Sequence, residues 1–225
     1  MDKRSDGGRP MPLDVKKLTV LSMLTALAYI VSVLLRIPFG AFLTYDMKDV
    51  LFTIGGFLYG SISMLPVIAA VCLLEMVTVS GTGIIGAVMA FVSSVSFVSV
   101  AAMIYQYRRK LSGAVIGLLA GTLLATLTML LWNVFLTPLY LGIPLEGVKE
   151  ILVPIVLPFN LLKGFLNSGV IMLVYKPLTS ILRRLGILEE TGASAKLKKR
   201  TALIAILALA VSVCSFALLI GWTLS

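Results

Sequence analysis

The residues with the greatest chemical potential lie around position 160, inside a long apolar stretch. Asn160, Lys163, Gly164 and Asn167 stand at positions i, i+3, i+4 and i+7, so in a helix they share one face. A lysine in such a stretch needs a partner or a cavity, because an isolated charge is costly in an apolar medium. Two amides and a glycine beside it can hydrogen-bond a polar ligand at close approach. The pattern predicts a ligand-binding surface.

A second polar group precedes another apolar run. Thr44, Tyr45, Asp46 and Asp49 stand at the expected start of a helix, where free N–H groups and the helix dipole favour carboxylates. The two carboxylates are therefore either helix caps or part of a binding site. Residues 37–43, just before them, are apolar for an exposed loop, which favours a lid over a cavity.

Two more polar residues lie within apolar runs. Glu75 is about one turn from the end of its run, so it reaches the interface, pairs with Lys48 or contributes to the site. Asn133 ends a semi-polar helical stripe, and it either hydrogen-bonds a neighbouring helix or contacts a ligand. Together with the preceding groups they predict one pocket, open to the outer side of a membrane.

The sequence lacks the residues that metal binding, acid–base catalysis by histidine and nucleotide binding usually require. The sequence holds no histidine, and its two cysteines, Cys72 and Cys214, lie in apolar runs without metal-ligand spacing. No G-x-x-x-x-G-K-S/T loop for nucleotide binding occurs. We therefore expect a protein that is not an enzyme and uses no metal or cofactor. An ATP-driven pump built on this chain would need its motor on another chain.

The elements that position these residues are apolar helices. Of the 225 residues, 59% are hydrophobic and 13% are charged, and the mean hydropathy is +1.06. A soluble core of this length could not bury so much apolar surface, whereas a membrane-spanning helix needs ~20 apolar residues. The sequence predicts an all-α integral membrane bundle with six or seven spans, at about residues 18–35, 50–64, 65–80, 84–105, 113–136, 151–175 and 201–222.

The net charge of +9 indicates membrane orientation rather than nucleic-acid binding, because the basic residues cluster beside the apolar runs. With a cytoplasmic N-terminus, fifteen of the nineteen lysines and arginines fall on the cytoplasmic side and three on the outer side. This bias predicts a multi-pass protein of the cell membrane with its N-terminus inside. It also requires a turn between the second and third runs, near Gly60, with Pro66 at a helix start.

Small residues indicate where helices approach closely. Gly113, Gly117 and Gly121 share one helix face, which favours packing within the bundle. The first apolar run holds two pairs of small residues at the same spacing, which either pack internally or contact a partner helix: Ser22, Ala26, Ala28 and Ser32.

We divide the chain into four parts by composition. Residues 1–15 are polar and are expected to be disordered. Residues 16–185 form the six-helix membrane domain, residues 186–200 form a charged linker, and residues 201–225 form an additional transmembrane helix outside the functional core.

Four segments together resemble a known family. They read YDMKDV at 45–50, IGGFLYG at 54–60, NVFLTPLY at 133–140 and LPFNLLKG at 157–164. In this order and spacing they are similar to the substrate-binding S components of energy-coupling factor (ECF) vitamin transporters, most of all to the riboflavin-specific branch. The resemblance covers about residues 15–185. The expected helix at 201–222 departs from the usual six-helix fold.

The resemblance implies a non-enzymatic subunit that captures riboflavin from outside and works with a membrane coupling subunit and two cytoplasmic ATPases. The outer loop after the first helix would close over the ligand, and small residues of that helix would face the coupling subunit. Asn133, Asn160 and Lys163 would contact the flavin. Beside them we place the other expected ligand contacts: Phe39, Thr44, Tyr45, Asp46, Glu75, Tyr140, Phe159, Gly164 and Asn167.

Three alternatives remain beside riboflavin capture. The nearest is the same role for another vitamin, such as folate, pantothenate or thiamine. A membrane enzyme acting on lipid would need a metal motif or a nucleophile with a base, and neither occurs within the spans. A self-sufficient secondary transporter usually shows inverted repeats, which this sequence lacks.

Overall fold

Residues 15–39 and 43–184 are described by the computed structural model of this chain. Nearly all of them are helical, and the spans expected at 16–185 fall within them. The expected linker at 186–200 and the expected helix at 201–222 lie outside the described residues. The elements in chain order are α1 (Val15–Leu34), β1 (Ile37–Phe39), β2 (Leu43–Tyr45), α2 (Lys48–Tyr59), α3 (Ser61–Thr78), α4 (Gly83–Arg108), α5 (Leu111–Leu141), α6 (Leu145–Ile151), the π-helical turn η1 (Leu152–Val156) and α7 (Leu157–Arg184).

The helices form a membrane-type bundle. Within the described residues, five segments are long and apolar enough to cross a membrane: 17–34, 61–78, 83–108, 111–138 and 145–175. The short helix α2 completes the six-helix core, packed against α1, α3, α4 and α7. The all-α membrane fold predicted from composition is therefore confirmed for the described part of the chain.

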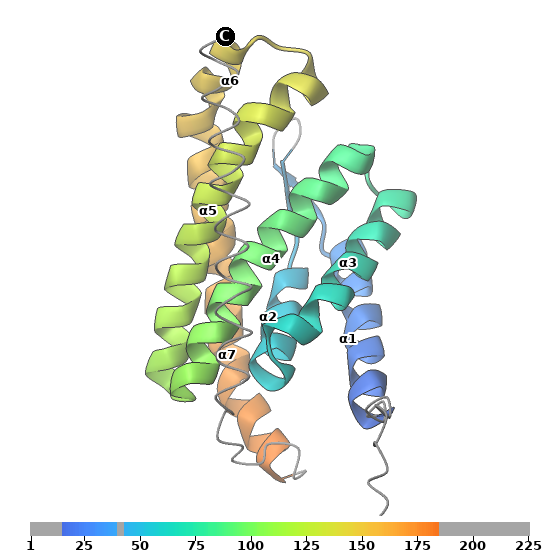
Figure 1. Cartoon of the computed structure of the whole chain (residues 1–225), viewed down its shortest axis with the longest axis vertical. Coiled ribbons are helices and arrows are strands. Elements are labelled where there is room, and N and C mark those ends of the chain that lie inside the picture. The colour runs from blue at the N-terminus through green and yellow to red at the C-terminus, as the bar shows by residue number, and fades with distance from the viewer. Residues whose placement is uncertain (1–14, 40–42, 185–225) are drawn as a thin grey trace, which may run out of the picture.

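In Figure 1, α4 lies between the pair α5 and α7 on one side and the group α1, α2 and α3 on the other. The core between them is apolar, with Phe52, Met64, Val98, Leu118 and Ile171 almost fully buried. At the lower end of the view α1 begins, α4 turns into α5 and α7 ends, whereas α6 lies at the upper end.

Gly60 separates α2 from α3 by itself. Its φ of +89° lies in a region that favours glycine, and a Cβ there would come 3.0 Å from the Gln106 side chain. The predicted turn is thus present, but the predicted helix start at Pro66 is wrong. The helix α3 already begins at Ser61, and Pro66 lies inside it. The glycine backbone, and not the proline, decides where the helix begins.

The glycine face of α5 allows α4 and α5 to pack backbone against backbone. A Cβ at Gly117 would come 2.7 Å from the carbonyl oxygen of Ala101, and one at Gly121 would come 2.7 Å from that of Phe97. Such distances leave no room for a side chain. The predicted packing role within the bundle is confirmed for these two glycines.

The apolar loop at 37–43 contains a two-stranded hairpin, which the sequence did not predict. Strands β1 and β2 are antiparallel, with Ile37 opposite Tyr45, Pro38 opposite Thr44 and Phe39 opposite Leu43. Each strand has only three residues. The hairpin connects the end of α1 to the start of α2.

The sixth apolar run is not one continuous helix. Leu152–Val156 is a π-helical turn between α6 and α7. Pro154 in this turn and Pro158 just after it both lack the N–H that a regular α-helix needs. The turn lies directly before the face that carries Asn160 and Lys163.

Candidate functional site

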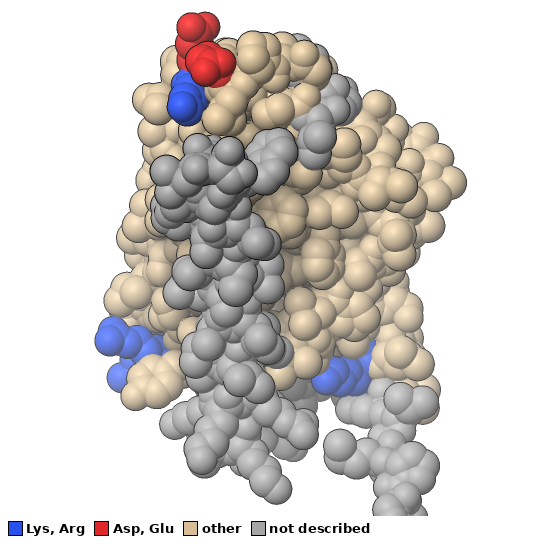
Figure 2. Space-filling view, turned by 45° about the horizontal axis from the view of Figure 1, so that its top comes forward, with Lys and Arg blue, Asp and Glu red and all other residues tan. Residues whose placement is uncertain are grey.

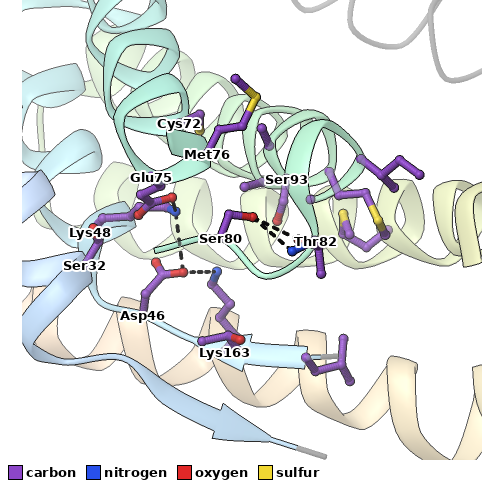
Figure 3. Close-up of a pocket in the computed structure, with 18 of the residues that line it drawn as sticks. Ser32, Asp46, Lys48, Cys72, Glu75, Met76, Ser80, Thr82, Ser93 and Lys163 are labelled. Carbon is purple, nitrogen blue, oxygen red and sulfur yellow. Dashed lines mark hydrogen bonds and ion pairs between the residues drawn. The ribbon is translucent and has the colours of Figure 1, made fainter. Parts of the chain in front are cut away.

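A cavity of about 150 Å³ lies at the hairpin end of the bundle. Five of the elements named above supply most of its wall: β2, α3, α4, α5 and α7. Its polar lining residues are Ser32, Arg36, Thr44, Asp46, Lys48, Glu75, Ser80, Thr82, Ser93, Thr137, Asn160 and Lys163. Figure 3 shows that Asp46, Lys48, Glu75 and Lys163 point toward one another across the space between these elements.

Asp46 links two lysines at the centre of the site. Its Oδ2 lies 3.3 Å from Lys163 Nζ and 3.6 Å from Lys48 Nζ. Lys48 Nζ in turn lies 2.5 Å from Glu75 Oε2. The groups come from the segment before α2 and from α2, α3 and α7, so the ion pairs connect elements distant in sequence. Buried charges persist in proteins when they are paired in this way.

The structure supports the pairing alternative for Glu75. Glu75 lies on α3 and lines the cavity, and its carboxylate accepts a hydrogen bond from Lys48. The pair joins the first residue of α2 to the last turn of α3.

Asp49 forms a second layer behind the cavity. Its Oδ2 lies 3.5 Å from Lys163 Nζ, and its Oδ1 accepts a hydrogen bond from Ser94 Oγ on α4 at 2.5 Å. Met47 is the N-cap residue of α2 and makes no side-chain cap hydrogen bond, while Asp49 lies in the first turn of this helix. The Asp49 carboxylate contacts Lys163 and accepts the hydrogen bond of the Ser94 hydroxyl.

The charge of Asp46 is set by opposing effects. Burial raises the pKa of this carboxyl, but the ammonium groups of Lys163 and Lys48 outweigh burial and hold the pKa below its usual value. Its Oδ1 is buried and accepts no hydrogen bond from the described residues. Since Asp46 also lines the cavity, the wall carries a carboxylate that is an acceptor of hydrogen bonds.

Tyr45 and Asn167 attach the hairpin to α7. The Tyr45 hydroxyl donates a hydrogen bond to Asn167 Oδ1 at 3.1 Å. Burial raises the pKa of the Tyr45 phenol, which keeps it protonated as a donor. Neither residue lines the cavity. Their hydrogen bond lies outside the cavity wall.

The two other asparagines differ in position. Asn160 lines the cavity and donates one amide hydrogen to the Val156 carbonyl in η1 at 2.8 Å. Asn133 is buried behind the cavity wall, donates to the Met129 carbonyl at 2.8 Å and accepts from Thr137 Oγ1 at 2.9 Å. Since Thr137 lines the cavity, Asn133 orients a wall residue.

Some of the remaining predicted residues line the cavity and others do not. Thr44 and Phe159 line the cavity, and the Phe39 ring of β1 lies 5.4 Å from the Phe159 ring of α7. Gly164 lies against Thr122 of α5, where a Cβ would overlap the threonine side chain. Tyr140 stands in the last turn of α5, and its side chain is outside the described residues.

Sequence reasoning missed the turn between α3 and α4. Ser80 and Thr82 of this turn line the cavity, as do residues of the first turns of α4. The two hydroxyls hydrogen-bond each other at 3.1 Å (Figure 3). A signal was present, because the turn joins the third and fourth apolar runs on the same side as the 37–43 loop.

The four small residues of α1 do not share one exposed face. Ser22 and Ala26 are exposed, whereas Ala28 and Ser32 are buried inside the bundle. Ser32 also lines the cavity. Placing Ala28 and Ser32 on a partner surface is therefore wrong, because their pair lies on a different side of the helix from Ser22 and Ala26.

Two curated proteins and one solved structure are similar to this chain. Riboflavin transporter RibU of Staphylococcus aureus is 31% identical over 178 residues, which cover 76% of this chain and 94% of the relative. Riboflavin transporter FmnP of Bacillus subtilis is 29% identical over 175 residues, which cover 72% and 92%. A solved structure described as the S component of a bacterial ECF transporter superposes with a TM-score of 0.65 at 30% identity, covering 75% of this chain and 98% of that one.

These relatives are transport proteins and not enzymes, and each is matched over nearly its full length. The family model described as "ECF transporter, substrate-specific component" matches residues 16–175, the same segment that folds into α1 to α7 around the cavity. By fold and by sequence, this chain belongs to the family of non-enzymatic, substrate-specific S components of ECF transporters.

Proposed function

We propose that this chain captures riboflavin at the outer face of the cell membrane for ATP-driven import. The observation that carries the proposal is the composition of the cavity wall, which combines the buried Asp46 and Asn160 and the half-buried Lys163 with the aromatic ring of Phe159. The curated relatives, which are riboflavin transporters, support it.

The flavin ring has chemistry complementary to this wall. Its carbonyls accept hydrogen bonds, which Lys163 and the second amide hydrogen of Asn160 can donate. Its imide N–H is a donor, and the carboxylate of Asp46 in the cavity wall can accept this hydrogen bond. The aromatic system can pack on Phe159, against which Phe39 of the hairpin already lies. In this arrangement the hairpin covers the bound ligand.

The transport cycle needs partners, because this sequence holds no nucleotide-binding loop. We assign the driving force to two cytoplasmic ATPases and a membrane coupling subunit. Ser22 and Ala26 on the exposed side of α1 allow another helix to approach closely, so we place the coupling subunit there. Binding itself requires no ATP in this scheme.

The test is a titration of the purified chain in detergent, without ATP, following the quenching of riboflavin fluorescence. We expect saturable, stoichiometric quenching at submicromolar to micromolar riboflavin. If folate, pantothenate or thiamine binds and riboflavin does not, the proposed substrate is wrong. If none of the four binds, vitamin capture itself is wrong.

A further inference from the structure

We propose that Asp49 is a positioning residue that holds the Lys163 ammonium in the orientation needed for ligand binding. This inference rests on the proposed function, in which Lys163 donates to the ligand. Asp49 lies outside the cavity wall, so it acts on the ligand only through Lys163.

The geometry around Asp49 divides its two oxygens between two partners. Oδ1 accepts from Ser94 Oγ at 2.5 Å, which ties the carboxylate to α4. Oδ2 lies 3.5 Å from Lys163 Nζ on α7. Asp49 itself is on α2 and is only 2% exposed. Three helices thus converge on one carboxylate whose position is fixed from both sides.

Lys163 needs this second carboxylate because its first one is shared. Asp46 Oδ2 lies near both Lys163 and Lys48, and Asp46 also lines the cavity. A ligand that engages Asp46 weakens its hold on Lys163. Asp49 does not face the ligand, so it keeps the ammonium paired and directed while the cavity fills. A buried ammonium without a carboxylate partner would be strongly disfavoured.

A purely structural role for Asp49 makes a different prediction. If Asp49 served only to join α2 to α4 through Ser94, its removal would loosen the bundle whether or not Lys163 is present. If it positions Lys163, its effect on ligand affinity depends on Lys163. A double-mutant cycle between the two residues separates the roles.

The experiment is the riboflavin titration on Asp49→Asn, a variant of nearly the same shape without the charge. We expect about tenfold weaker affinity, on the scale of a lost charged hydrogen bond. Asp49→Glu should restore part of the affinity. In a Lys163→Met background, Asp49→Asn should weaken affinity no further. Glu146→Gln, which removes an exposed carboxylate on α6, should bind as wild type.

Ser94→Ala is a second, milder route to the same test. It leaves the charge of Asp49 but removes the hydroxyl that fixes it, and it should weaken binding about threefold only while Lys163 is present. If Asp49→Asn fails to fold, the cycle of Ser94→Ala with Lys163→Met decides.

The outcomes separate this inference from the proposed function. Wild-type protein that binds no vitamin overturns both. Wild-type protein that binds, with Asp49→Asn and Ser94→Ala binding equally well, overturns the positioning role alone. Equal losses with and without Lys163 also overturn it, because they indicate a structural joint. If another vitamin binds instead of riboflavin, the same variants are titrated with that vitamin and judged by the same results.

Discussion

Ionisable side chains around the cavity stabilise one another through ion pairs that have partners in common. Each of the two lysines has two carboxylates within 4 Å: Lys48 has Asp46 and Glu75, and Lys163 has Asp46 and Asp49. In an apolar environment, removing one charged side chain from such a set leaves its partner with an uncompensated charge. The site is therefore a connected unit, in which Asp46 is a partner of both lysines.

Removing either cavity-lining donor on α7 should weaken riboflavin binding. Asn160→Ala and Lys163→Ala each leave a buried ligand group without its partner, which costs about 1–3 kcal/mol and corresponds to a roughly tenfold to hundredfold higher Kd. Fluorescence-quenching titration measures the change. The control is Ser112→Ala at the exposed start of α5, which should bind as wild type. Unchanged affinity in both α7 variants would place the ligand elsewhere.

Acid should destabilise the fold through Asp46. Because the pKa of this carboxyl is lowered in the folded protein, its ion pairs stabilise the fold fully above the ordinary aspartate value of about 3.9. This stabilisation is lost as the pH falls through the lower folded-state value. Thermal unfolding midpoints of wild type in detergent, measured from about pH 6 downward, should fall more steeply than those of Asp46→Asn. Parallel curves would contradict the assignment.

For single residues, the sequence spacing predicted which of them share a helix face, but it did not predict their hydrogen-bond partners. The face of Asn160, Lys163, Gly164 and Asn167 was visible as a helical pattern, and Asn160 and Lys163 reach the cavity. Asn133 uses its amide on its own helix, a local competition that spacing does not reveal.

Short elements between the helices shape the mouth of the cavity. The hairpin contributes Thr44 and Leu43 to the wall and reaches α7 through Tyr45 and Phe39. Its strands are too short for an alternating pattern to be recognised in sequence, so the loop was predicted as a lid without strands. The turn at Ser80 was missed because hydropathy marks spans and not the residues that connect them.

The close packing of α4 on α5 should be sensitive to one methyl group. Gly117→Ala places a Cβ against the Ala101 carbonyl, and such overpacking costs about 1–3 kcal/mol. The thermal unfolding midpoint should fall, and ligand affinity should fall with it if the helices separate. Gly169→Ala on α7 is the matched control, because a Cβ there meets nothing within 4 Å. Equal midpoints for the two variants would contradict the packing.

A bulky residue on the exposed side of α1 should block transport but not binding. Ala26→Trp adds volume where we place the coupling subunit, and it should abolish riboflavin uptake by cells while the purified chain binds normally. Leu123→Trp, at an exposed position of α5, should transport as wild type. Normal uptake by Ala26→Trp would move the docking surface away from this side of α1.

For the whole molecule, composition predicted the membrane bundle because lipid, unlike water, accepts so much apolar surface. The same argument could not place α2, which is only 12 residues long and joins the core through packing instead of length. Charge bias separated α2 from α3, since fusing them would invert every later loop. The break itself depends on Gly60, whose backbone conformation a hydropathy profile does not report.

Basic residues mark one end of the bundle. Lys17 at the start of α1 and Arg108 to Lys110 between α4 and α5 lie at the lower end in Figure 1. The space-filling view shows basic side chains there, and both acidic groups and a basic group at the upper end (Figure 2). Since lysine and arginine favour the cytoplasmic side, we assign the lower end to the cytoplasm and the cavity to the outside.

Single cysteines at the start of α5 and on α6, which follows the other end of α5, test this orientation. In a background with Cys72 and Cys214 changed to alanine, Ser112→Cys marks the basic end and Glu146→Cys marks the α6 end, both at exposed positions. The 31 residues of α5 extend about 46 Å at 1.5 Å per residue, which exceeds the ~30 Å hydrocarbon core, so the two sites lie on opposite sides. A membrane-impermeant maleimide added to intact cells should label Glu146→Cys at once and Ser112→Cys only after the cells are opened. Riboflavin binding by both variants shows that each is folded. Labelling of Ser112→Cys alone in intact cells would show that the orientation is the reverse of the one we assign. The cavity would then face the cytoplasm and could not capture a vitamin from outside.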